Sequence, residues 1–163
     1  MTVTDELLKN AESYADSFTK QALPMPPGKK VAVLACMDAR LNVYGVLGLS
    51  EGDAHVIRNA GGVVTDDAIR SLTISQRLLG TEEIILIHHT DCGMLTFKDD
   101  HVKDQIEADT GIRPPFALEA FADPDDDVRQ SIARINASPF VPRKDKIRGF
   151  VYEVESGRLR PVS

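Results

Sequence analysis

Three short apolar runs in the first 90 residues set the predicted architecture. They are VAVLA (31–35), AHVIR (54–58) and EIILIH (83–88). Each is nearly continuous and rich in β-branched residues, which is typical of strands that are buried on both faces of a parallel sheet. We therefore predict three buried strands.

A helix is predicted between the second and third runs. Thr65 suits the N-cap, Asp66 and Asp67 suit the positive end of the helix dipole, and Gly80 suits the C-terminal stop. Its apolar residues fall on one helical face: Ala68, Ile69, Leu72 and Leu79. A strand–helix–strand order favours parallel pairing.

The rest of the chain adds helices and an edge strand. We expect helices near 4–20, 98–109 and 124–136, and a closing strand and turn in IRGFVYEVESGRLRPV (147–162), with ESGR as the turn. Three prolines within LPMPPGKK (23–30) end the first helix, so residues 1–29 form an arm and linker that wraps the surface or a partner. The predicted fold class is α/β: one domain (1–163) with a mostly parallel central sheet flanked by helices, an N-terminal helical arm and a C-terminal edge strand.

Composition excludes several classes of protein. The net charge of −6 and the lack of a basic stripe argue against nucleic-acid binding, and no apolar run approaches the roughly 18 residues of a membrane span. The polar N-terminus has neither a secretory nor an Arg-rich transit signal, so we expect a cytoplasmic protein. In that reducing setting, two cysteines favour metal binding or catalysis over a disulfide.

Both cysteines follow predicted strands, and one lies close to a histidine. Cys36 follows the first run, and His89 and Cys92 follow the third. The carboxyl ends of parallel strands meet at one edge of a sheet, and thiolate and imidazole are the ligands that Zn²⁺ prefers. A lone buried cysteine is usually a small apolar residue, but this combination predicts a zinc site. The side chain of His88 should point away from that of His89 and pack in the core as a structural residue.

Three nitrogen and sulfur ligands leave a fourth position, as in catalytic zinc sites. Asp38 is the nearest group that could reach it, and Arg40 should pair with Asp38 and keep it ionised. The alternative is a surface ion pair worth ~0–1 kcal/mol. The loop VIRNAGGVVTDD (56–67) contains Gly61 and Gly62, which allow a tight turn that binds an anion or forms a pocket wall, although it matches neither a P-loop nor GxGxxG.

The motifs CMDARL, VIRNAGG and HHTDCGM together resemble the β-class carbonic anhydrases, most closely their short archaeal and mycobacterial type, from about Lys30 to Pro161. The resemblance implies a zinc ion held by Cys36, His89 and Cys92, and reversible hydration of CO₂ to bicarbonate by a zinc-bound hydroxide. It also implies that an Asp38–Arg40 dyad keeps the fourth position open, that Asp38 can close it, and that the active sites lie at a dimer interface. We accordingly assign Gly61 and Gly62 to substrate binding and expect a homodimer or homotetramer.

One departure and three alternatives remain. Plant-type members have a glutamine nine residues before the first zinc cysteine, where this chain has Pro27. Carbonyl sulfide hydrolases resemble the chain almost as well, and Leu41, Val43, Val63, Met94 or Leu95 would discriminate between the substrates. A zinc-binding module or bicarbonate sensor without turnover lacks a fourth Cys or His ligand. A thiol phosphatase would need arginine in place of Asn42.

Overall fold

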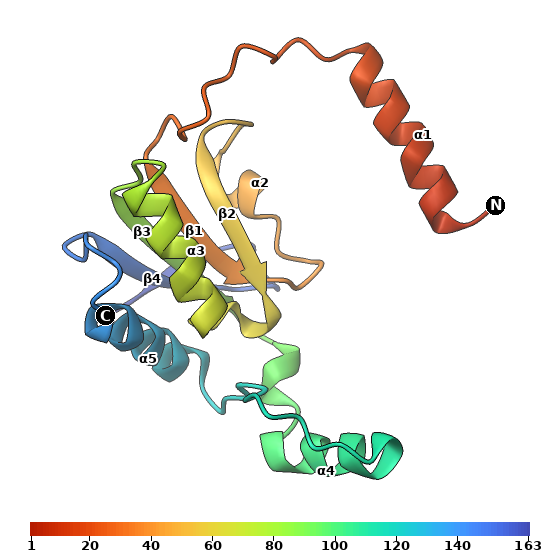
Figure 1. Ribbon diagram of the computed structural model, residues 1–163, viewed down its shortest axis with the longest axis vertical. Helices are drawn as coiled ribbons and strands as arrows, with labels where there is room; N and C mark the ends of the chain where they lie inside the picture. The colour runs from red at the N-terminus through yellow and green to blue at the C-terminus, as the bar shows by residue number, and fades with distance from the viewer.

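The central feature of the fold is a five-stranded sheet, seen in a computed structural model that describes residues 1–163 (Figure 1). The strand order is β2-β1-β3-β4-β5; the first four strands are parallel and β5 is antiparallel to β4. The strands are β1 (Val31–Cys36), β2 (Ala54–Asn59), β3 (Glu83–His89), β4 (Ile147–Tyr152) and β5 (Leu159–Val162). The predicted α/β class and mostly parallel sheet are confirmed.

Five α-helices connect or extend the strands. They are α1 (Val3–Asp16), α2 (Val43–Leu47), α3 (Asp66–Arg77), α4 (Asp99–Thr110) and α5 (Pro124–Ala137). Four were predicted, and Thr65 caps α3 as expected by accepting a hydrogen bond from the backbone N–H of Ala68. The short α2 was not predicted. Asn42 caps its first turn and Gly48, with φ 62°, ends it.

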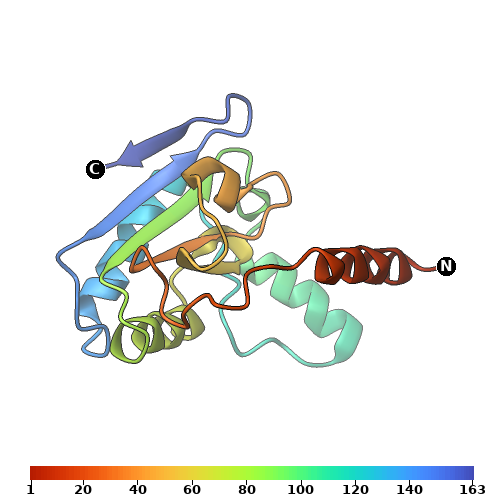
Figure 2. The same ribbon diagram turned by 90° about the horizontal axis from the view of Figure 1, so that it is seen from above.

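The sheet has two different faces, and β1 shows the difference most clearly. Ala32 and Leu34 lie in one apolar core with residues of α3 and α5, while Val33 and Ala35 lie in a second core on the opposite face. Figure 2 shows α3 and α5 along one side of the sheet and the five-residue α2 on the other. Met94, Phe97 and Phe121 pack on this second face as well.

Position in the sheet corrects one prediction. We expected the run at 54–58 to be buried on both faces, but β2 is an edge strand and its residues are half-buried or exposed. The fully buried strand is β1, which lies between β2 and β3. At the other edge, β4 lies inside the sheet and β5 forms the predicted C-terminal edge strand.

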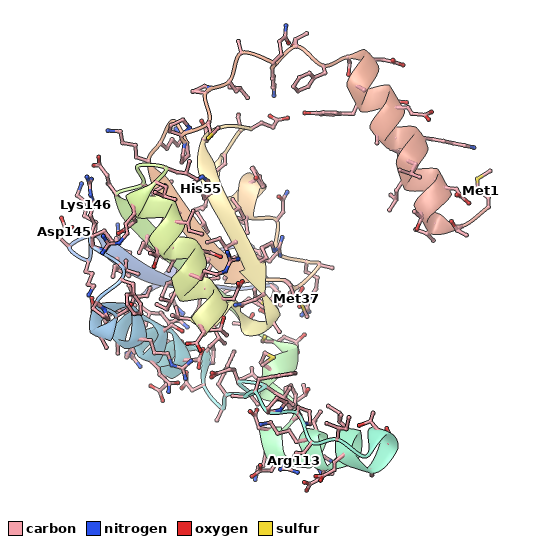
Figure 3. The ribbon with its side chains drawn as sticks, viewed as in Figure 1. Met1, Met37, His55, Arg113, Asp145 and Lys146 are labelled. Atoms are coloured by element: carbon pink, nitrogen blue, oxygen red, sulfur yellow. The ribbon has the colours of Figure 1, made fainter.

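The N-terminal helix stands apart from the sheet (Figures 1 and 2). No residue of α1 is buried, and Met1 lies at the tip of the arm (Figure 3). The Tyr14 hydroxyl at the other end of α1 donates to Glu51 at 3.3 Å. Large apolar residues of this arm are exposed: Val3, Leu7, Leu8, Tyr14 and Phe18. None of the helices has both the length and the apolar composition needed to cross a lipid bilayer.

Candidate metal centre

The parallel pairing of β1 with β3 brings the three predicted ligands together. Cys36 is the last residue of β1, His89 is the last residue of β3, and Cys92 follows three residues later. All three residues are buried, and their Sγ and imidazole nitrogen atoms lie within 4.8 Å of one another. The convergence expected from the sequence is therefore present.

The spacing of these donor atoms fits a tetrahedral zinc ion. A tetrahedron with Zn–S near 2.3 Å and Zn–N near 2.0–2.1 Å separates two sulfur atoms by about 3.8 Å, and sulfur from nitrogen by about 3.6 Å. The Sγ atoms of Cys36 and Cys92 are 4.0 Å apart, and Nε2 of His89 is 3.2 Å from Sγ of Cys36. Small movements of the side chains would admit the ion.

The imidazole of His89 is already oriented for this role. Its Nδ1 lies 2.7 Å from the carbonyl oxygen of Thr90, so Nδ1–H donates to that carbonyl and Nε2 faces the two thiols. Such a second hydrogen bond fixes the tautomer and the ring orientation of a metal-binding histidine. The neighbouring His88 points to the other side, as predicted, where its Nε2 lies 2.6 Å from a carboxylate oxygen of Asp127.

The two thiols and the imidazole shift one another's pKa values. The Cys92 thiol donates toward Cys36, and this contact, together with His89, lowers the pKa of Cys36 to about 4. The same contact, and then burial, raise the pKa of Cys92. Burial by itself would lower the pKa of His89, but its hydrogen bonds to Cys36 and to the Thr90 carbonyl outweigh burial and raise it.

Asp38 and Arg40 form the predicted pair beside these ligands. Nε and Nη2 of Arg40 donate to the two oxygens of Asp38 at 3.0 and 2.9 Å, and the backbone N–H of Arg40 donates to the same carboxylate at 2.8 Å. The guanidinium is the main cause that holds the pKa of Asp38 well below its usual range. Oδ2 of Asp38 lies 3.6 Å from Nε2 of His89, so the ionised carboxylate borders the ligand set.

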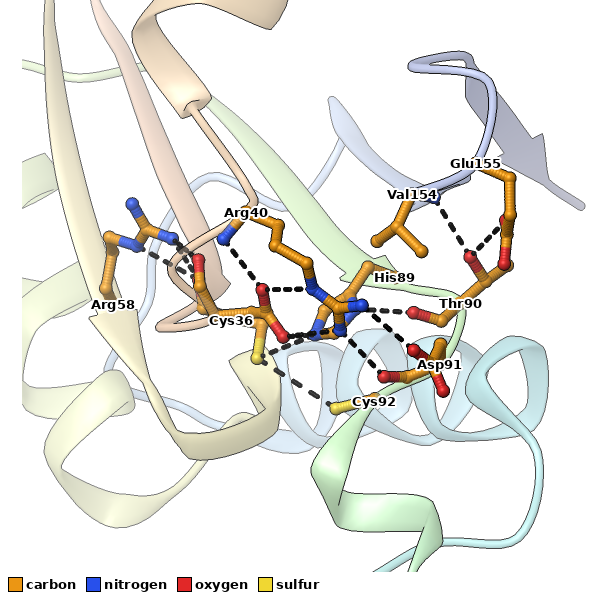
Figure 4. A network of polar contacts seen from close by, with 10 residues as sticks. Cys36, Arg40, Arg58, His89, Thr90, Asp91, Cys92, Val154 and Glu155 are labelled. Carbon is orange, nitrogen blue, oxygen red and sulfur yellow. Dashed lines mark hydrogen bonds and ion pairs between the residues drawn. The ribbon is translucent and has the colours of Figure 1, made fainter.

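Two further residues hold this pair, and sequence reasoning assigned a role to neither. Arg58 on β2 donates three hydrogen bonds to the carbonyl oxygens of Cys36 and Asp38, and Asp91 accepts from Arg40 (Figure 4). Both lie inside the motifs VIRNAGG and HHTDCGM. The sequence did offer one sign of their roles: each is a charged residue in the middle of a motif whose other residues are mostly apolar or metal-binding.

Gly61 and Gly62 form the wall behind the ligands. A Cβ at Gly62 would lie 2.8 Å from the backbone nitrogen of Cys36 and 2.9 Å from the carbonyl oxygen of Ile87, and its φ is 67°. The backbone N–H of Gly61 contributes to lowering the pKa of Cys36, which indicates that it faces the sulfur. Tight packing explains both glycines, and their assignment to substrate binding stays a prediction.

Of the five apolar residues expected to discriminate between CO₂ and carbonyl sulfide, only some lie close to the predicted ligands. Leu41, Val43 and Met94 belong to the same apolar core as Cys36 and Cys92. Val63 is also buried, whereas Leu95 is partly exposed. Pro27 precedes β1 and is buried at the opposite end of that strand from Cys36, so within one chain it lies far from the ligands.

Comparisons with known proteins agree on one family. Residues 31–159 match the family described as "Carbonic anhydrase". The chain is 61% identical to "Beta-carbonic anhydrase 1" of Mycobacterium tuberculosis (strain H37Rv), over 100% of this chain and 99% of that protein. It is also similar to the crystal structure of a carbonic anhydrase from Streptococcus mutans, at 43% identity and a TM-score of 0.93, covering 100% and 99% of the two chains. The "Carbon disulfide hydrolase" of Saccharolobus solfataricus is 35% identical over 96% of this chain and 87% of that protein.

Removal of one ligand is expected to abolish metal binding. We predict about one zinc ion per chain, and loss of both metal and activity in Cys36→Ser, His89→Ala and Cys92→Ser, because each removes one of three ligands that the chain supplies. Metal content by mass spectrometry of the purified variants checks this. The exposed histidine variant His101→Ala is the control and should keep its zinc; full zinc occupancy in Cys92→Ser would contradict the assignment.

Zinc affinity is expected to fall with acidification. The raised pKa values of Cys92 and His89 keep both groups protonated to higher pH, whereas zinc requires their unprotonated forms. Below the pKa of each group, zinc must displace its proton, so the zinc affinity should fall about tenfold for each such proton when the pH is lowered by one unit. Competition with a chromophoric chelator between pH 6.5 and 8.5 measures this, after correction for the chelator's own protonation. An affinity independent of pH would refute it.

Proposed function

Because this chain belongs to the β-carbonic anhydrase family, we propose that it is a zinc lyase that reversibly hydrates CO₂ to bicarbonate and a proton. The observation that carries this proposal is a buried Cys–His–Cys donor set bordered by a carboxylate that an arginine holds. The set supplies three ligands, as catalytic zinc sites do, and no third cysteine is available in the chain to close a structural site.

Cys36, His89 and Cys92 would hold the metal. Zn²⁺ bound there would act as a Lewis acid that lowers the pKa of a water ligand to about 7 and so makes hydroxide available at neutral pH. The two free cysteines must stay reduced to bind it, so we expect a reducing compartment such as the cytoplasm.

Asp38 would orient the attacking oxygen. With its pKa held low by Arg40, the carboxylate remains ionised at neutral pH and accepts a hydrogen bond from the nucleophile. That bond directs a lone pair of the oxygen toward the carbon of CO₂. A carboxylate this acidic is a poor store for a proton, so the proton released in the reaction should pass mainly to buffer.

The apolar side chains beside the ligands suit a small linear substrate. Leu41, Val43 and Met94 are buried around the cysteines and offer no polar group that would compete with the nucleophile. Because CO₂ has no dipole and few hydrogen-bond acceptors, a dry apolar wall next to a preorganised acceptor is a suitable environment.

A second candidate is hydrolysis of carbonyl sulfide to H₂S and CO₂ at the same centre. The similarity to a carbon disulfide hydrolase favours keeping it, because that protein is named for a sulfur-containing analogue of CO₂. Paired assays on one preparation, CO₂ hydration by stopped flow and H₂S release from COS, separate the two. A kcat/KM for CO₂ far above that for COS supports the lyase, and the reverse order supports the hydrolase.

We also propose that the chain works as a homodimer or homotetramer. The arm α1 buries none of its apolar residues within one chain. A second copy that receives the arm would cover apolar surface that water otherwise contacts.

Loss of the guanidinium should favour a closed, inactive form. In Arg40→Ala only the backbone N–H of residue 40 still holds Asp38, because a charge-assisted pair worth ~1.5–3 kcal/mol is gone. Activity should fall about tenfold to a hundredfold while zinc stays bound, since no ligand has changed. Zinc content and CO₂ hydration measured across pH 6.5–9 check this; wild-type activity throughout would mean that the dyad is an ordinary ion pair.

The companion variant Asp38→Ala should fail differently. The group that could block the metal is absent, and what is lost is the acceptor that orients the nucleophile. A concentrated exogenous buffer that accepts a hydrogen bond from the nucleophile should therefore restore part of the activity of Asp38→Ala but not that of Arg40→Ala. Equal rescue of the two variants would contradict these separate roles.

Charge on the apolar stripe of the arm should disrupt the oligomer. Leu7→Asp places a carboxylate among exposed apolar residues that a second copy would bury, whereas Ser13→Asp adds the same charge on the opposite side of α1. Light scattering at micromolar concentration should give a smaller species for Leu7→Asp and the wild-type mass for Ser13→Asp. A monomeric, fully active wild-type protein would rule out this part of the proposal.

A further inference from the structure

Arg40 is held between two carboxylates rather than paired with one. Its Nη1 donates to Oδ2 of Asp91 at 2.9 Å, and its Nη2 donates to the backbone carbonyl oxygen of Asp91, also at 2.9 Å. Figure 4 shows the guanidinium next to Asp91, on the segment that joins His89 to Cys92. The segment that supplies two metal ligands therefore also grips the arginine of the dyad.

The two carboxylates do not compete for the same donors. Asp38 takes the hydrogen of Nε and one hydrogen of Nη2, while Asp91 takes the other hydrogen of Nη2 through its carbonyl and one of Nη1 through its side chain. Four of the five guanidinium N–H groups are thereby engaged. The contacts of Asp91 thus fix the plane of the guanidinium and leave both of its bonds to Asp38 intact.

The backbone of Asp91 is adapted to this contact. Its φ is 52°, in the left-handed region that only a few non-glycine residues adopt, aspartate among them. Thr90, which precedes it, is anchored from the β4–β5 loop, because its Oγ1 donates to Glu155 at 3.1 Å and accepts from the N–H of Val154 at 3.0 Å. A strained residue that its surroundings hold in place is typical of a functional position.

We propose that Asp91 is a positioning residue for the reaction. It locks the guanidinium of Arg40 in the orientation that keeps Asp38 on the arginine and away from the metal. The inference rests on the proposed function, since it concerns the same dyad. Asp91 does not touch the substrate; it acts through Arg40.

The competing explanation is an exposed ion pair without effect. The side chain of Asp91 is 72% exposed, and exposed pairs often contribute nothing measurable. Two features distinguish Asp91 from such a pair: the backbone carbonyl contact, which needs the left-handed conformation, and a partner whose other donors hold Asp38. Asp67, which is 74% exposed and pairs with Nε of Arg70 at 2.8 Å, offers the ordinary case for comparison.

The experiment compares Asp91→Asn with Asp67→Asn, and repeats Asp91→Asn in the Arg40→Ala background. Asparagine keeps the size of the side chain and tolerates the left-handed conformation, so folding should be unaffected. We expect Asp91→Asn to keep its zinc and lower kcat/KM by about threefold to tenfold, as expected for one weakened charge-assisted bond. Asp67→Asn should match the wild type. In Arg40→Ala, adding Asp91→Asn should change nothing further, because the residue through which it acts is gone.

A second readout does not depend on turnover. In the metal-free protein, the Nε–H resonance of Arg40 should be sharp and slow to exchange in the wild type, and broadened in Asp91→Asn. Asp91→Gly, which removes the carboxylate and relieves the backbone, should broaden it without lowering the melting temperature. A wild-type resonance in both variants, wild-type kcat/KM in Asp91→Asn, or an equal loss of activity with and without Arg40 would each overturn the inference. If the wild type hydrates no CO₂, the proposed function fails, and the resonance alone still decides whether Asp91 holds Arg40.

Discussion

Parallel pairing of β1 with β3 is the constraint on which the rest of the site depends. The register aligns Ala35 with Ile87, so the two strands end at the same edge of the sheet, one on Cys36 and the other on His89. A ligand from a remote part of the sequence is thereby fixed by backbone hydrogen bonds within a buried core. The pairing places the Cys36 sulfur beside the His89 imidazole, and the short segment after β3 adds the Cys92 sulfur.

Around this edge, charge is arranged in concentric layers. The buried thiols and imidazole lie innermost, the Asp38 carboxylate borders them, and Arg40 holds that carboxylate from the outside. Arg58 holds the backbone at Asp38, and Asp91 holds the guanidinium of Arg40. Each layer limits the freedom of the next one inward, which is the preorganisation that the proposed reaction would require.

The features that could be predicted from the sequence are those that depend on local residue patterns. The three strand runs, the capped helix after Thr65 and the pairing of Asp38 with Arg40 follow from periodicity, capping and spacing, and all are found in the structure. What could not be predicted depends on tertiary position. The edge location of β2 changes its burial, and the grip of Asp91 on Arg40 spans 51 residues of sequence. This contact depends on the register in which β1 pairs with β3, and no local sequence pattern specifies that register.

The most direct test of this account is the coordination of the metal in the wild-type protein. X-ray absorption at the zinc edge, on protein loaded with one equivalent of zinc, counts the sulfur and the light-atom neighbours separately. We predict two sulfur atoms at about 2.3 Å, from Cys36 and Cys92, and two nitrogen or oxygen neighbours at about 2.0–2.1 Å, one of them from His89. A shell without sulfur, or with only one sulfur atom, would contradict it.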